Sequence, residues 1–228
     1  MNLNNFRKNL ICWGAADQCM VLKPIIERLG ARYDILVDDT PNKVSPYQDV
    51  ELLSGKMAFE SWFKGRNPAE YGFVIAIGNP YGFVRCQLHD YLVDKGLTPV
   101  SVCDPSALLD EGISIGPGAQ IMKGVIVNAH ASIGKQVILN TKSLIEHHDM
   151  LGDGVEIGPG ATLCARVNVA KFSWVCAGST IIPRMSVGEN AIVGAGSVVR
   201  QTVLDNHVVA GVPAKFLKMN AVQPVDNQ

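Results

Sequence analysis

Aromatic residues are scarce in this 228-residue chain, at 7% of positions, although hydrophobic residues make up 47%. A core of ordinary size is therefore available, and it must be built mainly from small and branched aliphatic side chains. The chain also has no excess of charge of one sign, because it contains 20 Lys and Arg residues and 21 Asp and Glu residues. This balance gives no excess of positive charge for binding nucleic acid or an anionic membrane surface.

Long apolar runs and cysteine motifs are missing as well. No run approaches the ~20 residues that span a bilayer, and residues 1–8 lack the apolar stretch of a secretory signal. The six cysteines have no repeated short spacing, which argues against a zinc knuckle and against a disulfide framework. We therefore expect a cytoplasmic protein without a metal, whose thiols are reduced and mostly buried.

A period of six residues runs through the second half of the chain. From Ile115 onward, the first residue of fourteen consecutive hexads is aliphatic, and the fifth is nearly always small or apolar. Many second positions are glycine, which we assign to turns that need unusual backbone angles. This period fits neither an α-helix nor alternating strands, and an ordinary β-sandwich would not keep it. It predicts a triangular coil, three hexads to a turn, with the aliphatic side chains inside.

The first hundred residues follow a different pattern. We expect strands and helices to alternate, at residues 9–13, 18–29, 33–37, 73–77, 82–95 and near 100. This order predicts a Rossmann-like parallel sheet with right-handed crossovers. We accordingly divide the chain into an α/β domain, a coil and a loose polar tail, at residues 1–104, 105–218 and 219–228.

Three loops follow strands of the expected sheet, at residues 14–18, 38–39 and 78–79. Because ligands of parallel sheets bind at the carboxyl ends of strands, these loops are candidates for holding a nucleotide. The acidic pair Asp38 and Asp39 could hold ribose hydroxyls, although the three-glycine dinucleotide fingerprint is absent. The alternative interpretation is structural, with Asp17 as a helix N-cap and the other two aspartates solvated.

The hexad 145–150 breaks the pattern of the coil, because its fifth residue, Asp149, is the only charged one among fourteen. It also holds two of the five histidines of the chain. One hypothesis is that His147 acts as a general base. A second is a metal site made of His130, His147 and His148, which is disfavoured because adjacent residues on a strand point to opposite sides. A third is a polar corner without function.

Five segments carry a family resemblance. They read Trp13-Gly14-Ala15-Ala16-Asp17-Gln18, Asp38-Asp39, Ala76-Ile77-Gly78-Asn79 with Arg85 beyond it, Leu139-Asn140-Thr141 with Ile145-Glu146-His147, and Ala210-Gly211-Val212-Pro213-Ala214-Lys215. They resemble the left-handed β-helix acetyltransferases that modify sugars, including nucleotide-linked amino-sugar N-acetyltransferases and sialic acid O-acetyltransferases. The resemblance covers nearly all of residues 9–218. It implies an α/β N-terminal Rossmann-like domain followed by a left-handed parallel β-helix of hexapeptide repeats.

The resemblance also implies a function and a site. We expect an N-acetyltransferase that uses acetyl-CoA and a nucleotide-linked amino sugar, in a homotrimer whose active sites lie between subunits. The catalytic base is His147, with three further residues of the site at Asn140, Glu146 and His148. The nucleotide sugar falls on Ala16, Asp17, Gln18, Asp38, Asp39 and Gly78. The coenzyme falls on Glu156, Ala165, Ala177, Ala195 and Lys215. The alternatives are a sugar O-acetyltransferase of the same fold and a trimeric binding protein that has lost catalysis.

Two positions depart from the family pattern. His148 stands where the family has Asp or Glu, and a neutral imidazole cannot stabilise an imidazolium as a carboxylate does. Glu146, Asp149 and Asp153 are the candidates to take over that role. Glu156 stands where many members have a second His near the thioester carbonyl, and a carboxylate cannot donate a hydrogen bond to an oxyanion unless it is protonated.

Overall fold

The computed structural model describes residues 9–221 and divides them into two compact units. The first unit contains residues 9–78 and 87–102, and the second contains residues 79–86 and 103–221. A single division at residue 104 therefore misses residues 79–86, which belong to the second unit. Within residues 9–221, no helix has the length and apolar character needed to cross a bilayer.

The first unit is built on a parallel sheet with strand order β3-β2-β1-β4-β5, which confirms the Rossmann-like prediction. Its strands are β1 (Asn9–Trp13), β2 (Arg32–Asp38), β3 (Glu51–Ser54), β4 (Tyr71–Ile75) and β5 (Thr98–Pro99). Its helical segments are α1 (Asp17–Arg28), α2 (Gly55–Phe63), η1 (Pro68–Glu70) and the larger part of α3 (Gly82–Asp94). Strand β3 and helix α2 lie in the stretch for which the sequence predicts no element. The rings of Trp13, Phe59 and Tyr91 meet edge to face in the core of this unit.

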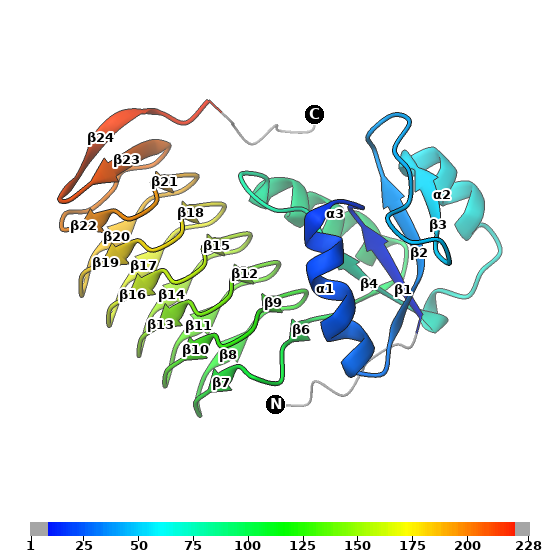
Figure 1. The fold of residues 1–228 in the computed structure, drawn as a ribbon, viewed down its shortest axis with the longest axis horizontal. Coiled ribbons are helices and arrows are strands. Elements are labelled where there is room, and N and C mark those ends of the chain that lie inside the picture. The colour runs from blue at the N-terminus through cyan, green and yellow to red at the C-terminus, as the bar shows by residue number, and fades with distance from the viewer. Residues whose placement is uncertain (1–8, 222–228) are drawn as a thin grey trace. The chain divides into compact units, whose positions relative to one another are not determined.

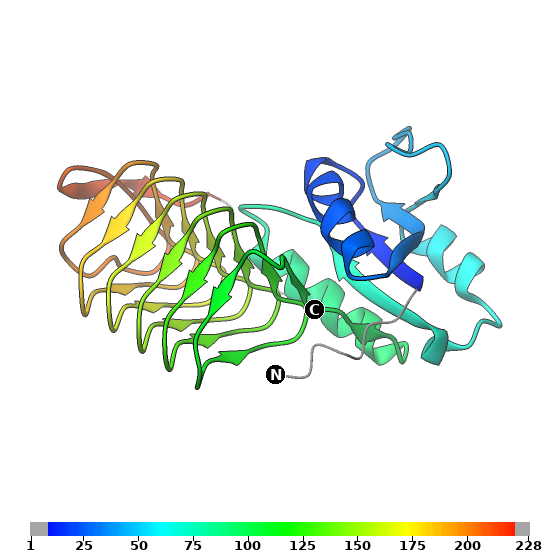
Figure 2. The ribbon, with the colours of Figure 1, turned by 60° about the horizontal axis from the view of Figure 1, so that its bottom comes forward.

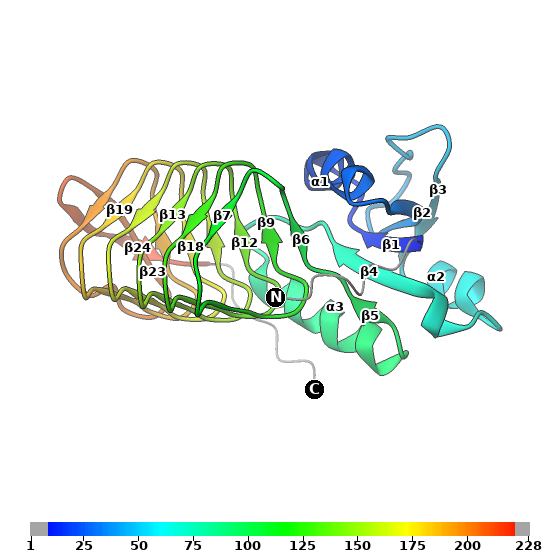
Figure 3. The same cartoon turned by 90° about the horizontal axis from the view of Figure 1, so that it is seen from below.

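The second unit is a coil of stacked rungs, each rung made of three short parallel strands (Figures 1, 2 and 3). The first face consists of β6 (Val102–Cys103), β9 (Gln120–Ile121), β12 (Ile138–Leu139), β15 (Glu156–Ile157), β18 (Trp174–Val175) and β21 (Ile192–Val193). The second face consists of β7 (Leu108–Leu109), β10 (Ile126–Val127), β13 (Leu144–Ile145), β16 (Thr162–Leu163), β19 (Thr180–Ile181) and β22 (Val198–Val199). The third face consists of β8 (Ser114–Ile115), β11 (Ser132–Ile133), β14 (Met150–Leu151), β17 (Asn168–Val169) and β20 (Ser186–Val187).

The register of the coil confirms the predicted repeat. Val127 pairs with Ile145, and Ile145 pairs with Leu163, so one rung takes 18 residues, or three hexads. The aliphatic first positions point inward, and these three are fully buried. The coil begins before Ile115. Strands β6 and β7 precede β8, which contains Ile115, and they already pair with β9 and β10 of the next rung. The hairpin of β23 (His207–Gly211) and β24 (Ala214–Met219) closes the first face.

Glycines in the repeat either adopt positive φ angles or allow close stacking of the rungs. The prediction that the second-position glycines have unusual backbone angles is wrong. Positive φ angles occur at the fourth position of the hexads instead, for example at Gly118 (73°) and His148 (62°). A second-position glycine is required by close stacking. A Cβ on Gly158 would stand 2.6 Å from the backbone N of Ala177 in the next rung.

The end of the chain is more ordered than the expected loose tail. Asn220 is buried, its backbone N–H donates to the carbonyl of Asn206 at 2.7 Å, and its side-chain amide donates to the carbonyl of Asn190 at 3.0 Å. Residues 219–221 are therefore part of the coil unit. The rest of the expected tail, residues 222–228, lies outside the described residues, as does the stretch 1–8 that was expected to lack a signal.

Candidate active site

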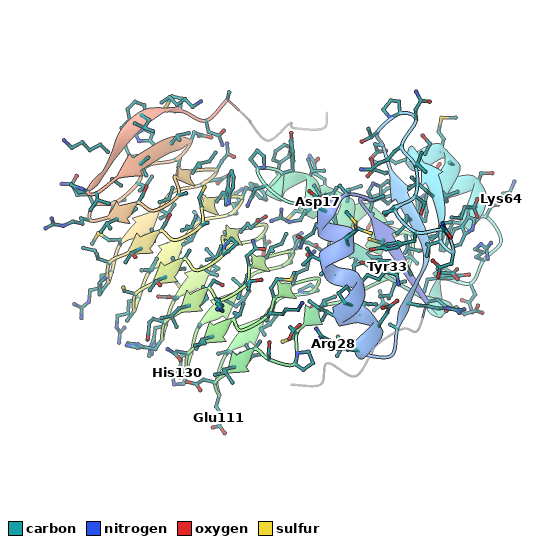
Figure 4. The ribbon with its side chains drawn as sticks, viewed as in Figure 1. Asp17, Arg28, Tyr33, Lys64, Glu111 and His130 are labelled. Atoms are coloured by element: carbon teal, nitrogen blue, oxygen red, sulfur yellow. The ribbon has the colours of Figure 1, made fainter. Side chains whose placement is uncertain are left out.

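Two corners of the coil carry the predicted catalytic residues. The turns from the second face to the third are called the 2–3 corner, and those from the first face to the second the 1–2 corner. His147 and His148 occupy the 2–3 corner directly after β13, and both are exposed. Asn140 begins the turn of the 1–2 corner after β12. Figure 4 labels Glu111 and His130, which lie along the same edge of the coil, in earlier turns of the 2–3 corner.

The rings of His147 and His148 face each other. Their Nδ1 atoms are 3.0 Å apart, which is hydrogen-bond distance, and the ring planes are nearly perpendicular at 87°. The expectation that these neighbours point to opposite sides is wrong, because it assumed a strand. Here the chain turns, and His148 has a left-handed φ of 62° that brings its ring back toward His147. Within residues 9–221, no group of three or more His, Cys, Asp or Glu could hold a metal ion.

The three carboxylates predicted to orient His147 are engaged elsewhere. Asp149 accepts the backbone N–H groups of Glu146 and Val167, at 2.9 and 2.8 Å. Glu146 accepts the backbone N–H of His147 at 3.1 Å, and Asp153 accepts that of Lys135 at 2.8 Å. None of these recorded bonds reaches the His147 ring. That one of these carboxylates orients His147 stays a prediction.

Asp149 is a fully buried carboxyl directly under the histidine corner. Burial raises the pKa of Asp149 to about 7, and the negative charge of Glu146 adds to this effect, while the N–H donors of Val167 and Glu146 offset only part of it. An unfolded aspartate ionises near pH 4. The folded protein therefore holds one more proton than the unfolded chain between these values, so Asp149 makes stability fall as pH rises from about 4 to about 7.

We expect the substitution Asp149→Ser to remove this pH dependence. Serine fits the position, because Ser173 occupies the same place in another hexad and its hydroxyl accepts the backbone N–H of Ala191 at 3.1 Å. Urea unfolding at several values between pH 4.5 and 7.5 checks the prediction. The stability difference between wild type and variant should change by up to about 1.4 kcal/mol per pH unit. Parallel stability curves for the two proteins contradict the assignment.

A polar group of three residues, two of them buried, lies along the first face beside β12 and β15. The side-chain amide of Asn140 donates to Oε1 of Glu156 at 2.9 Å, and Arg85 from α3 places Nη1 3.7 Å from Oε2 of Glu156. Arg85 also donates through Nε to the carbonyl of Gln136 at 3.1 Å and through Nη2 to that of Gly154 at 2.7 Å. Residues 79–86 belong to the coil unit, so these bonds all lie within one unit.

Burial dominates the electrostatics of Glu156. It raises the pKa of Glu156, and the opposite effects of the Arg85 guanidinium and the Asn140 amide offset only part of this shift. One carboxyl oxygen accepts from Asn140 and the other faces Arg85. While it is ionised, Glu156 cannot supply the hydrogen-bond donor that a histidine at this position would bring to a thioester oxygen.

The remaining residues predicted to bind the coenzyme are divided between the corners. Ala165 follows His147 in the 2–3 corner, where the N–H of Arg166 bonds the carbonyl of His147 at 3.2 Å. Ala177 and Ala195 are exposed and stacked in the 1–2 corner, and Lys215 lies exposed on β24. A face is six residues wide at ~3.3 Å per residue, so the two corners lie up to about 20 Å apart in one chain. The recorded side-chain contact of Asn140 is with Glu156 and that of His147 is with His148, so no recorded bond joins Asn140 to His147.

In the first unit, Asp38 ties the predicted nucleotide loops together. Its carboxylate accepts the N–H of Ala15 at 2.7 Å, that of Thr40 at 3.0 Å and the Lys43 ammonium at 2.8 Å. Burial by itself would raise the pKa of Asp38, but these donors outweigh it and lower the pKa to about 2. Asp38 is thus ionised, and its carboxylate fixes the loop after β1 by accepting the N–H of Ala15.

The other members of this group lie around the start of α1 and the ends of the strands. Asp39 is exposed and accepts the indole N–H of Trp13 at 3.2 Å. Asp17 is the first residue of α1, the N-cap is Ala16, and no side chain caps the helix, so the alternative interpretation of Asp17 as an N-cap is wrong. Figure 4 marks Asp17 and Arg28 at the two ends of this helix. Gln18 and Gly78 are half-buried.

Comparison with known proteins finds relatives for both units. No family model matches the chain. The fold matches a GDP-perosamine N-acetyltransferase from Caulobacter crescentus, solved with CoA and GDP-perosamine, over 92% of this chain and 97% of that one, with a TM-score of 0.83 and 26% identity. The acetyltransferase domain of PglB from Neisseria gonorrhoeae matches over 92% and 100%, with a TM-score of 0.82 and 25% identity. The chain is therefore similar in fold and sequence to acetyltransferases over nearly its whole length.

Other acetyltransferases match only part of this chain. Serine acetyltransferase 2 of Arabidopsis thaliana is 30% identical over 169 residues, which are 69% of this chain and 49% of that protein. The chain spans about half the length of the curated relatives that head the comparison, at 56% and 49%.

Two features of the site were missed or only partly identified from the sequence. The sequence marks Arg85 only as part of a motif, because its partners Gln136, Gly154 and Glu156 lie 51 to 71 residues away. The column of cationic or titratable residues at the fourth positions of the 2–3 corner, namely His130, His148, Arg166 and Arg184, could have been found by writing the hexads in three columns.

Proposed function

We propose that this protein transfers the acetyl group of acetyl-CoA to the amino group of a nucleotide-linked sugar. The observation that carries the proposal is the exposed His147 imidazole on a rigid coil corner, whose Nδ1 already has a partner at 3.0 Å. That contact leaves Nε2 free to take a proton from an acceptor. The similarity to an N-acetyltransferase solved with CoA and GDP-perosamine covers both units and supports the substrate class.

The reaction is a direct transfer with His147 as general base. The acceptor nitrogen attacks the thioester carbonyl and loses a proton to Nε2 of His147, and the coenzyme thiolate leaves as the amide forms and takes a proton back. No cysteine is acylated, in keeping with a buried Cys176 whose thiol pKa burial raises to about 11. Holding two reactants in attack geometry contributes roughly 7–11 kcal/mol, and the base about 10²- to 10⁴-fold in rate.

The two corners suggest that the active site is completed by a second subunit of a homotrimer. The base lies at the 2–3 corner, whereas Asn140, Glu156, Ala177 and Ala195 lie on the first face or at the 1–2 corner. The second face lies between these corners, and the outward residues of its strands form a ladder of apolar side chains and threonines at Leu108, Ile126, Leu144, Thr162, Thr180 and Val198. Covering this ladder with a neighbouring copy would bury apolar surface and bring one subunit's base to the other subunit's corner.

We therefore expect the paired substitution Ile126→Glu and Leu144→Glu to break the assembly. Two carboxylates on adjacent rungs would have to be buried without partners in the interface. Light scattering should show three 24.5-kDa chains for the wild type and a smaller species for the variant. The matched control is Ser132→Glu, outward and exposed on the third face, which should leave the mass unchanged. A wild-type monomer, or a variant that keeps its mass, contradicts the proposed interface.

The first unit is the proposed holder of the nucleotide. The turns after β1, β2 and β4 are at the carboxyl ends of neighbouring strands, where α/β sheets bind ligands. The N-cap residue of α1, Ala16, provides no side-chain cap, and a helix N-terminus suits a diphosphate. Asp39 supplies an exposed carboxylate for sugar hydroxyls.

A panel of acceptors tests the proposed function. Release of coenzyme A thiol should be followed with acetyl-CoA and UDP-, GDP- and dTDP-linked amino sugars, and binding of each should be measured by calorimetry with coenzyme A present. Turnover of one amino sugar supports the proposal. A second candidate, transfer to a hydroxyl, is favoured by the similarity to serine acetyltransferase 2, so serine and deaminated sugars belong in the same panel. Binding without thiol release points instead to a trimeric binding protein that has lost catalysis.

A further inference from the structure

The 3.0 Å contact between the two Nδ1 atoms determines where the protons of the histidine pair must be. One of the two nitrogens has to donate and the other has to accept, because a neutral imidazole has one of each. If His147 takes a proton at Nε2, its own proton must be on Nδ1. His148 must then accept at Nδ1 and carry its proton on Nε2, which requires it to be neutral.

We propose that His148 is a positioning residue that takes the place of a carboxylate by accepting the Nδ1 proton of His147, so that the pair works only when both rings are neutral. This inference rests on the proposed function. It is based on the contact itself and on the two carboxylates of the same turn, Glu146 and Asp149, whose recorded bonds go to backbone N–H groups.

The surroundings favour a neutral His148. Its ring lies 5.1 Å from the ring of His130 in the preceding rung, and Arg166 occupies the same corner in the following rung. Partial loss of hydration, followed by the charges of Arg166, His130 and His147, lowers the pKa of His148. On its own turn it faces Glu146 and Asp149, which are held by the backbone. A cation next to the pair thus keeps the acceptor free of the extra proton.

The consequence is that the first proton taken up by the pair inactivates it. An imidazolium at position 148 has no lone pair at Nδ1 to offer to His147. In an enzyme with a carboxylate at this position, the acceptor stays ionised across the same range. The two rings titrate as a coupled pair, because the charge of one disfavours protonation of the other.

Three substitutions at position 148 separate positioning from a structural role. Asparagine keeps an acceptor that does not titrate and tolerates the left-handed backbone well. Aspartate restores an ionised acceptor. Phenylalanine has no acceptor, and its fit is shown by Phe172, which has a φ of 63° at the fourth position of another hexad. The matched control is His130→Asn, with the same φ of 62° one rung away, where no bond to His147 is recorded.

The first readout needs no substrate. In histidine-labelled protein, two-bond ¹H–¹⁵N correlations report which nitrogen of His147 carries the proton at pH 8. We expect Nδ1–H in the wild type, His148→Asn and His130→Asn, and loss of that preference in His148→Phe. Equal tautomer populations in the wild type and His148→Phe overturn the proposal. This result holds whether or not any acetyl acceptor is found, so it is independent of the acceptor panel.

The second readout is the pH profile of acetyl transfer. His148→Asn and His148→Asp should retain kcat at pH 8 within about tenfold, and the acid limb should move to higher pH in His148→Asp because the carboxylate stabilises the imidazolium of His147. His148→Phe should lose most of kcat, with little change in KM. Equal kcat at pH 8 in the wild type and His148→Phe would overturn the proposal.

Discussion

Replacing Arg85 with methionine should lower the free energy of unfolding by about 3–5 kcal/mol. The guanidinium of Arg85 is fully buried, and it satisfies the carbonyls of Gln136 and Gly154 as well as facing the carboxylate of Glu156. Removing it leaves a buried carboxylate without its cation and two carbonyls without this donor. Methionine preserves most of the volume of the aliphatic part of the arginine side chain, so the loss of stability measures the contribution of the guanidinium.

A paired substitution distinguishes the lost charge partner from lost packing. In Arg85→Met combined with Glu156→Gln, no uncompensated buried charge is left, so part of the stability should return. Urea midpoints of the two single variants and the double variant give the coupling between the residues. Arg85→Lys should fall between wild type and Arg85→Met, because one ammonium cannot reach all three acceptors with the geometry of a planar fork.

The control is Arg184→Met, an exposed arginine of the same coil, which should change stability by no more than about 0.5 kcal/mol. If Arg85→Met is as stable as this control, the bonds of Arg85 do not anchor the first turn of α3. If the double variant is no more stable than Arg85→Met, the cost comes from the unsatisfied carbonyls or from packing, and the buried ion pair is not its source.

The coil could be predicted because its signal is repeated. Each hexad presents an aliphatic residue to the same interior, so the pattern persists even where one hexad deviates at Asp149. Strand β3 and helix α2 were missed for the opposite reason. Glu51–Ser54 is an edge strand with two half-buried apolar residues, so no alternation marks it. Residues 79–86 were assigned to the wrong unit because the partners of this segment, such as Phe172 against Phe83, are distant in sequence.

The sequence predicts which residues form the candidate site, but it does not predict which partners their side chains contact. His147, Asn140 and Glu156 are recognisable from their motifs, but their partners depend on side-chain direction at corners. Strand alternation fails at such corners, because the fourth residue adopts a left-handed φ and reverses the expected side for His148. Likewise, nothing in the local sequence shows that both oxygens of Asp149 accept backbone N–H groups, one of them from Val167 in the next rung.

Replacing His147 with asparagine should lower kcat by about 10²- to 10⁴-fold while leaving coenzyme A binding nearly unchanged. Asparagine is polar and smaller, so it keeps the exposed corner hydrated, but it cannot take a proton at neutral pH. Because positioning of the two substrates does not depend on the base, the residual rate should remain well above the uncatalysed reaction. His130→Asn, exposed at the equivalent corner one rung away, is the control and should retain full turnover.

The pH dependence of the residual activity identifies what His147 does. The acceptor amine must be deprotonated to attack in either protein, so its ionisation affects wild type and variant alike. The additional fall in rate that protonation of the base causes should be present in the wild type and absent from His147→Asn. Steady-state kinetics and calorimetry with coenzyme A check both expectations. If the variant loses coenzyme affinity in proportion to its rate, His147 is a binding residue, and a variant with full turnover places the base elsewhere.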